Sequence, residues 1–591
     1  MKIRRTFRVL FTDGFRAAPK AMTAAALTTL VTALAQVTYP LGIQTMVNAL
    51  AHHDVSGEIA GTIVVAVLFT LSWGLLIVSS GQGQALTDRV SVWLSARIAG
   101  LVNAVPGLEH FERPDYVTEL ERLEQRRPML AAGPRQLLTL ASVAVRTIGI
   151  AVLLGTVYPP LVLLPLSGLP PYFADKHSVA VRERTEKRIA EQRRLAGELF
   201  ELTATAGPAK EIRTYGLGDE LRARHDELTA GARRAVVRAA TAGALWSALG
   251  WFLYAAGFVA AIAVIAVRAA HGDASPGQVV LAVSLLRRAQ LTVSQASNAI
   301  GRVVTTASAA QSLFWLEDHA QAQRTSGGPA PDRLHHGITL QDVSFTYPGT
   351  DTPVLQDVNL FLPAGSTVAI VGENGAGKTT LIKLLTGMYP PSEGRILLDD
   401  TDLAEVDRAG WRVRTAAAFQ DFVKWNLLAG QTVGVGDLPR LDDEPAVRTA
   451  LDRAAATTIV AELADGLATP LGKSFQGGAE PSGGQWQKLA LGRAMMRDDP
   501  LLLVLDEPTA SLDAPTEAAL FRRYVEAAHR TAEGTGAVTV LISHRFSTVR
   551  MADLIIVLED GRIREAADHA GLLAAGGLYA ELFELQARAY R

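Results

Sequence analysis

Four long stretches without any charged residue constrain the fold of this chain more than any other feature of its sequence. These stretches are residues 21–51, 59–87, 147–174 and 239–267. Each exceeds the roughly 20 apolar residues that a helix needs to cross a bilayer. The third is interrupted by Tyr158-Pro159-Pro160, which divides this region into spans near 137–157 and 160–174, and a weaker sixth span begins near Ser275. The pattern predicts six membrane-spanning helices in the first half of the chain.

The distribution of Lys and Arg predicts how these helices are oriented. Basic residues are frequent in 1–20, 88–136 and 175–238, whereas 52–58 and 158–160 contain none and 268–274 contains one. Because cytoplasmic segments carry the excess of Lys and Arg, we expect both termini in the cytoplasm and three short outer loops. The two long inner stretches have helical patterns, so the helices are expected to continue beyond the membrane. A large soluble helical domain is the alternative, but the length of the uncharged stretches and the charge bias argue against it.

Three arginines fall inside the predicted spans, namely Arg146, Arg287 and Arg288. No Asp or Glu lies in the six spans to neutralise them. An intramembrane charge normally faces a cavity or a partner, so one interpretation is a substrate pathway that favours anionic or carbonyl-rich cargo. The other interpretation is that these side chains extend to the inner membrane interface. Both interpretations stay open at the level of sequence.

The amino-acid composition limits which kinds of protein and which kinds of site the chain can form. The 591 residues are enough for two or more domains. The absence of cysteine excludes disulfides, Cys-ligated zinc and iron–sulfur clusters, and the net charge of −2 carries no signature of nucleic-acid binding. Residues 319–337 are polar and rich in Pro and Gly, and an α/β pattern follows them. We therefore expect a transmembrane domain over 1–320, a linker over 321–337 and an α/β domain over 338–591.

A phosphate-binding pattern lies near the start of this second domain. The run Gly372-Glu373-Asn374-Gly375-Ala376-Gly377-Lys378-Thr379-Thr380 fits G-x-x-x-x-G-K-[ST]. It follows the β-branched run 367–371, which is typical of a buried parallel strand, and precedes 381–385, which is typical of a helix. Glycines let backbone N–H groups approach phosphates, and the helix N-terminus adds a favourable dipole. Lys378 is expected to reach the β and γ phosphates and the Thr379 hydroxyl to bind Mg²⁺. The alternative, a chance glycine turn, does not explain the order of strand, loop and helix.

Further polar residues follow other predicted strands of this domain. The apolar run 501–505 ends in Asp506-Glu507, which suits nucleotide chemistry at the carboxyl edge of a sheet. Asp506 is expected to hold Mg²⁺, and Glu507 to orient or deprotonate an attacking water. His544 follows the run 538–543 and is placed to contact the γ-phosphate. Tyr347 precedes the phosphate loop, where its ring could stack on an adenine.

Together these residues resemble the ATP-binding cassette (ABC) transporters, specifically exporter-type half-transporters, over essentially the whole chain. The resemblance adds Gln420 as a residue that binds Mg²⁺ and couples to the membrane domain, Asp513 in Ser511-Leu512-Asp513, and the signature Ser482-Gly483-Gly484-Gln485, which binds ATP held on an opposite subunit. It also identifies 110–116 and 209–217 as cytoplasmic coupling elements. It implies ATP and Mg²⁺ as cofactors, with Glu507 and His544 as the catalytic residues. The implied nucleotide contacts are Tyr347, Gly372, Asn374, Gly375, Ala376, Gly377, Lys378, Thr379, Thr380, Gln420, Ser482, Gly483, Gly484, Gln485 and Asp513, and the implied metal ligands are Thr379, Gln420 and Asp506.

The signature has a physical basis and one departure from the family pattern. Ser482 can cap a helix whose open N-terminus is an anion site without a lysine of its own. Such a site needs a phosphate delivered from elsewhere, so a dimer with two ATP sites at its interface is expected. Pro481 stands where the family usually has Leu, and Gly492 lies inside the following helix. Proline before an N-cap is compatible with the helix, but the lost Leu packing could loosen the motif.

The resemblance implies ATP-driven export of a hydrophobic or amphipathic compound by alternating access. A drug, a lipid, a natural product or a processed peptide would each fit as cargo. The transporter would be a homodimer or heterodimer in the bacterial inner membrane, with both termini and the ATPase domain in the cytoplasm. The alternatives are an importer of a siderophore-like compound on the same fold and an ATP-gated regulator that transports nothing. An intact Glu507 and His544 favour turnover over pure regulation.

Overall fold

The computed structural model describes residues 5–6, 8–323, 327–473, 475–507, 534–543 and 545–589. The chain forms two compact units. The first contains Met1–Leu101 and Leu120–Glu317, and the second contains Val102–Glu119 and Asp318–Arg591. A short segment from within the helical half therefore packs with the second unit. The expected limits of the transmembrane domain and the linker stay predictions.

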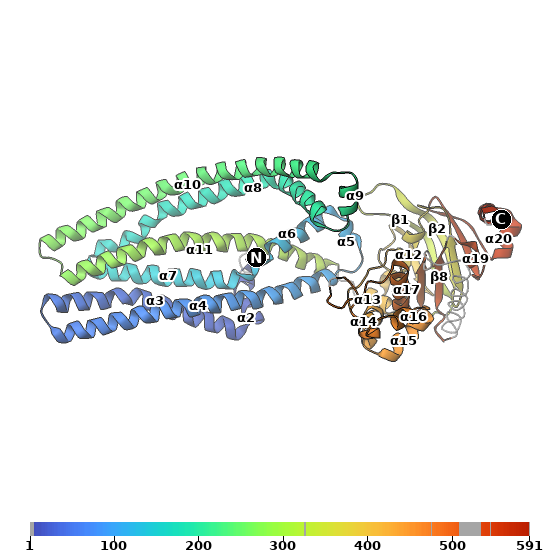
Figure 1. Ribbon diagram of the computed structural model, residues 1–591, viewed down its shortest axis with the longest axis horizontal. Helices are drawn as coiled ribbons and strands as arrows, with labels where there is room; N and C mark the ends of the chain where they lie inside the picture. Colours follow the sequence, from blue (N-terminus) through green and yellow to red (C-terminus); the bar gives the residue numbers. More distant parts are fainter. Residues whose placement is uncertain are drawn as a thin grey trace. The chain divides into compact units, whose positions relative to one another are not determined.

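The first half of the chain is helical (Figure 1). It begins with η1 (Arg8–Thr12), a turn of π-helix, and α2 (Asp13–Ala17). The longer helices are α3 (Pro19–Ala51), α4 (Val55–Asn103), α6 (Pro114–Ala131), α7 (Gly133–Val157), α8 (Leu169–Ala204), α10 (Gly218–Ala270) and α11 (Pro276–Ala322). The breaks after α3, α7 and α10 fall where the charge pattern predicts outer loops. The continuous α4, α8 and α10 confirm that helices extend through the long basic stretches.

Four of these helices, α3, α4, α7 and α10, are long and apolar enough to cross a membrane by length and composition. The span expected near 160–174 is not a single α-helix, which corrects the prediction. Instead η2 (Pro159–Gly168) is a 3₁₀-helix, and α8 begins only at Leu169. Pro159 and Pro160 lack the backbone N–H that an α-helix would use, so the chain tightens here before α8 starts. The sixth expected span lies in α11.

A charged network joins the N-terminal helices to two long helices of the first unit. Arg97 of α4 donates from Nη1 to Oδ2 of Asp13 at 2.9 Å and also contacts Glu317 of α11. Arg8 donates from Nη2 to Oε2 of Glu317 at 2.7 Å. Asp13 is buried, and its desolvation cost is offset only because the arginine charge lies beside it. The network therefore holds η1 and α2 against α4 and α11.

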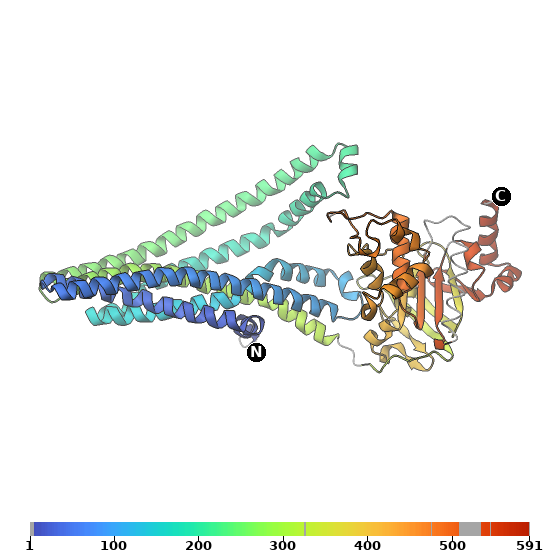
Figure 2. The same cartoon turned by 60° about the horizontal axis from the view of Figure 1, so that its bottom comes forward.

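Helices α8 and α10 pack along each other and are joined by α9 (Ala209–Thr214). Figure 2 shows this green pair separating from the other helices of the first unit toward the α9 end. Tyr215, directly after α9, is 71% exposed, and Leu217 is also exposed. An exposed aromatic residue at the tip of a projecting helix pair is typical of a contact surface.

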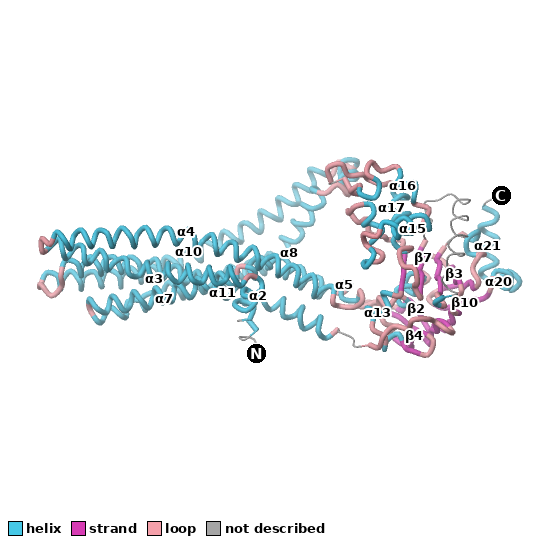
Figure 3. Tube along the Cα trace, turned by 90° about the horizontal axis from the view of Figure 1, so that it is seen from below, coloured by secondary structure: helices cyan, strands magenta, loops and turns pink. Residues whose placement is uncertain are grey.

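The second unit contains two sheets, whose strands are shown in Figure 3. The four-stranded antiparallel sheet has the order β2-β1-β4-β5, and the six-stranded sheet has the order β10-β9-β3-β8-β7-β6, parallel except for its β10–β9 edge. The strands are β1 (Gly337–Thr346), β2 (Pro353–Pro363), β3 (Thr367–Val371), β4 (Glu393–Leu398), β5 (Thr401–Asp402), β6 (Thr415–Ala418), β7 (Leu502–Asp506), β8 (Val538–Ile542), β9 (Leu554–Glu559) and β10 (Arg562–Ala567).

Helices cover these sheets and complete an α/β domain. Strands β3, β7 and β8 are buried at every residue, as expected for the centre of a parallel sheet with two covered faces. The short segment with α5 (Glu109–Glu112) belongs to this unit. The remaining helices are α12 (Lys378–Leu385), η3 (Leu403–Glu405), α13 (Arg408–Val413), α14 (Ala429–Gly434), η4 (Leu438–Arg440), α15 (Glu444–Arg453), α16 (Thr457–Ala461), η5 (Gly466–Ala468), α17 (Gly483–Ala494), α19 (Phe546–Val549), α20 (His569–Ala575) and α21 (Leu578–Ala589).

Candidate functional site

The phosphate loop lies between β3 and the N-terminus of α12. Gly372 has φ +155°, and a Cβ at this residue would lie 2.1 Å from the Leu558 carbonyl oxygen. Gly377 has φ +102° and is the N-cap of α12, where a Cβ would lie 2.8 Å from the Leu355 side chain. Only glycine fits both positions without moving a neighbouring strand. The structure therefore confirms the predicted strand, loop and helix, with Asn374, Gly375 and Ala376 between the two glycines.

Lys378, at the first position of α12, turns back across this loop. Its Nζ donates to the carbonyl oxygens of Gly372 at 2.8 Å and Glu373 at 2.7 Å. Burial lowers the pKa of the ammonium group, while Glu507 and Asp506 act in the opposite direction. The positive charge is therefore held inside the loop, near the carboxylates of Asp506 and Glu507 at the carboxyl end of β7.

The two carboxylates meet the phosphate loop because β7 and β3 both pair with β8 in parallel. Asp506 is buried and hydrogen-bonded to the Thr379 side chain. Burial, with the nearby charges of Glu507 and Asp421, raises the pKa of the Asp506 carboxyl to about 6. A buried carboxyl with a raised pKa beside a phosphate loop is suited to a cation, since an added positive charge would favour its ionised form.

Glu507 has a left-handed backbone, with φ +46°, which is uncommon for a residue other than glycine. Its N–H donates to the Ile542 carbonyl oxygen at 3.1 Å. Its Oε2 accepts from Nε2 of Gln420 at 2.9 Å. A strained backbone conformation of this kind persists only where the surrounding structure holds it in place, and such residues are frequent at functional sites. Here it brings Glu507 and Gln420 together.

A residue that the sequence analysis missed holds the same strand end. Gln487, in α17, donates from Nε2 to the backbone carbonyl oxygen of Glu507 at 2.9 Å. Its position two residues beyond the signature motif is the only local signal, and nothing in the pattern shows which strand it would meet. This bond joins α17, the helix that carries the signature motif, to the end of β7, where Asp506 and Glu507 lie.

Ser482 caps α17, as predicted. Its Oγ accepts from the Gln485 N–H at 3.3 Å, and the Gln485 side-chain oxygen accepts from the Ser482 N–H at 2.8 Å. This reciprocal capping box forms with Pro481 buried directly before it. Gly483 and Gly484 occupy the first turn, so no side chain obstructs the helix N-terminus. The departure at Pro481 therefore leaves the cap intact.

Replacing Ser482 by Ala should remove this cap and cost about 1 kcal/mol of stability, while Ser482→Asn should retain most of it. The measurement is the midpoint of thermal unfolding of the purified protein, followed by a signal from the α/β domain. An equal shift in both variants would show that the hydroxyl hydrogen bond does not stabilise the helix.

Tyr347 lies at the edge of the phosphate loop, half-buried beside α12. Its hydroxyl is 3.0 Å from Oγ1 of Thr380, and its ring faces the Lys383 ammonium group at 5.2 Å. It is therefore close enough to the loop for the predicted adenine contact, which stays a prediction. His544 and Asp513, the other two residues expected at the site, lie outside the described residues.

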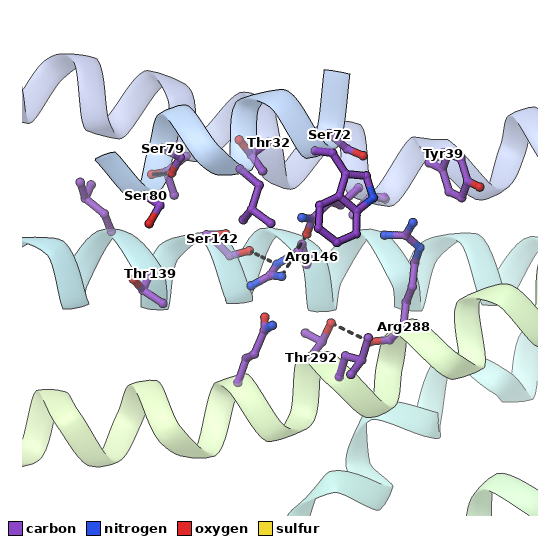
Figure 4. A pocket seen from close by; sticks show the side chains of 18 of the residues that line it. Thr32, Tyr39, Ser72, Ser79, Ser80, Thr139, Ser142, Arg146, Arg288 and Thr292 are labelled. Atoms are coloured by element: carbon purple, nitrogen blue, oxygen red, sulfur yellow. Dashed lines mark hydrogen bonds between the residues drawn. The ribbon is translucent and has the colours of Figure 1, made fainter. Parts of the chain in front are cut away.

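A separate cavity of about 880 Å³ lies within the helical unit. Figure 4 shows Arg146 of α7 and Arg288 of α11 extending into the space between these helices and α3 and α4. All three arginines expected in the membrane spans line it, together with Arg135 and Arg302, and none of the described residues that line it is Asp or Glu. The other lining side chains are mainly hydroxyl-bearing or apolar, among them Thr32, Ser72, Trp73, Leu76, Ser79, Thr139, Ser142, Ile150 and Thr292.

The cavity arginines are held by neutral groups. Arg146 donates from Nη1 to Oε1 of Gln36 at 3.1 Å. Arg288 lies over the Tyr39 ring, with its Cζ 5.1 Å from the ring centroid. Because neither partner is an anion, these contacts orient the guanidinium groups and leave their charge available.

Comparison with known proteins shows the family to which the chain belongs. A family profile described as ABC transporter matches residues 355–510. The ATP-dependent lipid A-core flippase of Chromobacterium violaceum is 33% identical over 64% of this chain and 62% of its own length. The chain thus spans about three-fifths of that relative. The protein of the same name from Ralstonia nicotianae is 34% identical over 69% of this chain and 67% of its own length.

A solved structure, described as a bacterial Atm1-family ABC exporter with ATP bound, has the same fold. It superposes with a TM-score of 0.79 over 96% of this chain and 99% of that chain, at 21% identity. The long helical region and the α/β domain both take part in this match. Given also the extent of the match to the Ralstonia relative, the chain belongs to the ABC transporter family, as an exporter-type half-transporter in which a multi-pass membrane region is fused to an ATP-binding cassette.

Proposed function

We propose that this protein uses ATP to export an anionic amphipathic compound across the bacterial inner membrane. The observation that carries this proposal is the cavity with five arginines and no acidic residue in its lining. The relatives named as lipid A-core flippases support an amphipathic lipid as cargo. Drugs, natural products and processed peptides with an anionic group are further members of the same chemical class.

The arginine charges favour an anionic group inside this cavity. A cluster of like charges in a membrane region is costly unless a counter-ion or bound anion compensates it. Arg135 donates from Nη1 to Oε1 of Gln84 at 3.1 Å, so it too has a neutral partner. Guanidinium groups form bidentate, charge-assisted hydrogen bonds with phosphates and carboxylates. The anionic cargo would thus supply the missing negative charge.

The rest of the lining explains why the cargo would also be apolar. Trp73, Leu76, Leu138, Ile150 and Leu291 contribute apolar surface to the same cavity as the arginines. A ligand with a charged head and an apolar body would contact both kinds of side chain at once. Burial of its apolar part contributes roughly 25 cal/mol per Å² removed from water.

The nucleotide site would supply the driving force. The backbone of the phosphate loop, Lys378 and Thr380 would bind the phosphates, and the Tyr347 ring would stack on adenine. The hydroxyl of Thr379, the carboxylate of Asp506 and the side-chain amide of Gln420 carry oxygen ligands of the kind that Mg²⁺ prefers. Asp506 is hydrogen-bonded to Thr379, and Gln420 contacts Glu507, the residue after Asp506. When bound there, Mg²⁺ would neutralise phosphate charge. Glu507 would orient or deprotonate the attacking water, with His544 and Asp513 completing the site.

Two copies, or this chain and a related half-transporter, would form the working transporter. The N-terminus of α17 offers capped but open backbone N–H groups, with Ser482, Gly483, Gly484 and Gln485 in its first turn. This end is suited to a phosphate carried by a facing cassette. The tip of the α8–α10 pair presents the exposed Tyr215 and Leu217, which would suit a contact with a second subunit. Both features favour a dimer.

Replacing Arg146 or Arg288 by Gln should weaken binding of an anionic amphiphile by about 10-fold or more, since one charge-assisted hydrogen bond contributes about 1.5–3 kcal/mol. The measurement is the stimulation of ATPase activity in nanodiscs by a phosphorylated lipid and by its dephosphorylated counterpart. The matched control is Arg238→Gln, an exposed arginine of α10 outside the cavity lining. Arg287→Gln tests the third expected residue.

Unchanged stimulation in the Arg146, Arg287 and Arg288 variants would favour arginines that merely extend to the membrane interface. Direction is tested separately in inverted membrane vesicles that contain the wild-type protein. ATP-dependent accumulation of the lipid probe in the inner leaflet or lumen of those vesicles supports export, whereas ATP-dependent loss supports import.

A further inference from the structure

The contact between the segment Val102–Glu119 and the cassette lies inside one compact unit. The Leu108 N–H donates to the Met388 carbonyl oxygen at 3.1 Å. Gly107 has φ +89°, and a Cβ there would lie 2.8 Å from the same Met388 oxygen. The backbone therefore approaches the cassette as closely as glycine allows. One residue farther along the cassette, the Tyr389 hydroxyl donates to Oε1 of Glu112 in α5.

Tyr389 is 2% exposed and packs in a cluster of aromatic rings. Its ring lies edge-on to Phe345, at 5.4 Å, and to Tyr347, at 5.6 Å and 82°. The Lys383 ammonium group lies over both tyrosine rings, 5.2 Å from Tyr347 and 5.7 Å from Tyr389. The ring proposed to stack on adenine and the ring that bonds α5 thus share one cation and touch each other.

These contacts are anchored to the phosphate loop by a single rigid helix. α12 begins at Lys378 and ends at Leu385, and the Met388 N–H donates to the Lys383 carbonyl oxygen at 2.9 Å. The Tyr347 hydroxyl meets Thr380 in the first turn of the same helix. A change in the position of Tyr347 or of α12 must therefore alter the packing of Tyr389, because close-packed rings cannot absorb a shift without moving a neighbour.

We propose that Tyr389 and Glu112 form the route by which nucleotide binding at Tyr347 reaches the first coupling segment, Val102–Glu119, of the same chain. Tyr389 is a positioning residue: it touches neither phosphate nor cargo. Nucleotide binding shifts the Tyr347 ring and its Lys383 cation, and the Tyr389–Glu112 hydrogen bond carries that shift to α5. Since α4 ends at Asn103 and α6 begins at Pro114, α5 is covalently continuous with both helices. This inference rests on the proposed function, because it requires ATP to bind the cassette.

The chemistry of the Tyr389–Glu112 pair makes their hydrogen bond strong and directional. A tyrosine hydroxyl and a carboxylate form a charge-assisted hydrogen bond, which is stronger and more directional than one between neutral groups. Burial raises the pKa of the Tyr389 hydroxyl, and the hydrogen bond to Glu112 acts in the same direction. The hydroxyl therefore stays protonated and remains a donor. Tyr389→Phe removes this donor and keeps the ring, so the aromatic packing survives while the link to α5 is lost.

The test is hydrogen–deuterium exchange of the full-length protein in nanodiscs, with and without ATP and Mg²⁺. Wild-type protein should show ATP-dependent protection both in the phosphate loop, 372–380, and in 102–119. Tyr389→Phe and Glu112→Gln should keep the protection of the loop and lose the ATP-dependent change in 102–119. Their effects should not add in the double variant, because both remove one interaction. Glu109→Gln removes a carboxylate from the same short helix without removing the acceptor of Tyr389, and it should behave as wild type.

The outcomes separate this inference from the proposed function. Loss of ATP-dependent protection of the loop in the wild type would overturn ATP binding itself, and the inference with it. A wild-type response in 102–119 that persists in both Tyr389→Phe and Glu112→Gln would overturn the inference alone. A purely structural role would raise exchange in 102–119 equally with and without ATP, leaving the difference between the two states unchanged, and that result also contradicts the inference.

Discussion

Replacing Glu507 by Gln is expected to reduce ATP hydrolysis by about 10²- to 10⁴-fold while leaving ATP binding close to wild type, as for loss of a general base. Gln has nearly the same shape as Glu but cannot accept a proton from water. The left-handed backbone at Glu507 and the bonds from Gln420 and Gln487 hold the side chain at the edge of the phosphate loop. Those supports remain in the variant, so the loss is expected in turnover.

The measurement is Mg²⁺-dependent ATPase activity of the purified chain in lipid nanodiscs, beside a direct ATP-binding assay and the size of the particle. Glu480→Gln, an exposed glutamate outside the site, is the matched control. Turnover within twofold of wild type in Glu507→Gln would show that another group activates the water. Glu507-dependent turnover in a dimer-sized particle would mean that this chain alone is sufficient, whereas a silent monomer would point to a second half-transporter.

Replacing Lys378 by Met should have the second-largest effect, a fall in ATP affinity of about 10- to 100-fold, because a charge-assisted contact to phosphate that contributes about 1.5–3 kcal/mol is lost. In the structure Nζ also holds the carbonyl groups of Gly372 and Glu373. Met keeps much of the length and apolar body of the side chain, so the helix start is preserved. The loss should therefore appear in binding before any effect on the chemical step.

Equilibrium binding of a fluorescent ATP analogue measures this effect, with Lys473→Met as the exposed control lysine of the same domain. Together the two cassette variants separate binding from turnover: Lys378→Met should lose both, and Glu507→Gln only turnover. Affinity within twofold of wild type for Lys378→Met would contradict the assignment of this loop as the phosphate site.

Much of the nucleotide site follows from local sequence because its geometry is local. Gly372 and Gly377 have backbone conformations, or neighbours, that only glycine accepts, so the spacing of residues around them already describes the loop. Ser482 and Gln485 form their capping box within a single turn. The uncharged stretches likewise predict membrane helices because every backbone group must find its hydrogen bond inside the segment.

The fourth membrane span shows where local reasoning fails. The high hydropathy of residues 160–174 shows that this segment is apolar, but it does not show which kind of helix forms. The prolines at the start of the segment decide that. The strand order is a second feature that local sequence did not predict. β3 and β7 both pair with β8, but the apolar residues of a buried strand do not indicate which strands lie beside it. Gln487 could not be assigned a role from sequence for the same reason.

The chemical groups of this protein can be predicted from local sequence: a phosphate loop, two carboxylates at the end of a strand, a capped helix, and arginines without acidic partners in a membrane region. Which of these groups meet depends on the tertiary structure. Arg146 and Arg288 come from helices far apart in the chain and line one cavity, and Glu112 meets Tyr389 across 277 residues. The physical reason is that motif geometry is set by neighbouring backbone angles, whereas such long-range contacts depend on how whole helices and sheets pack, which no local pattern encodes.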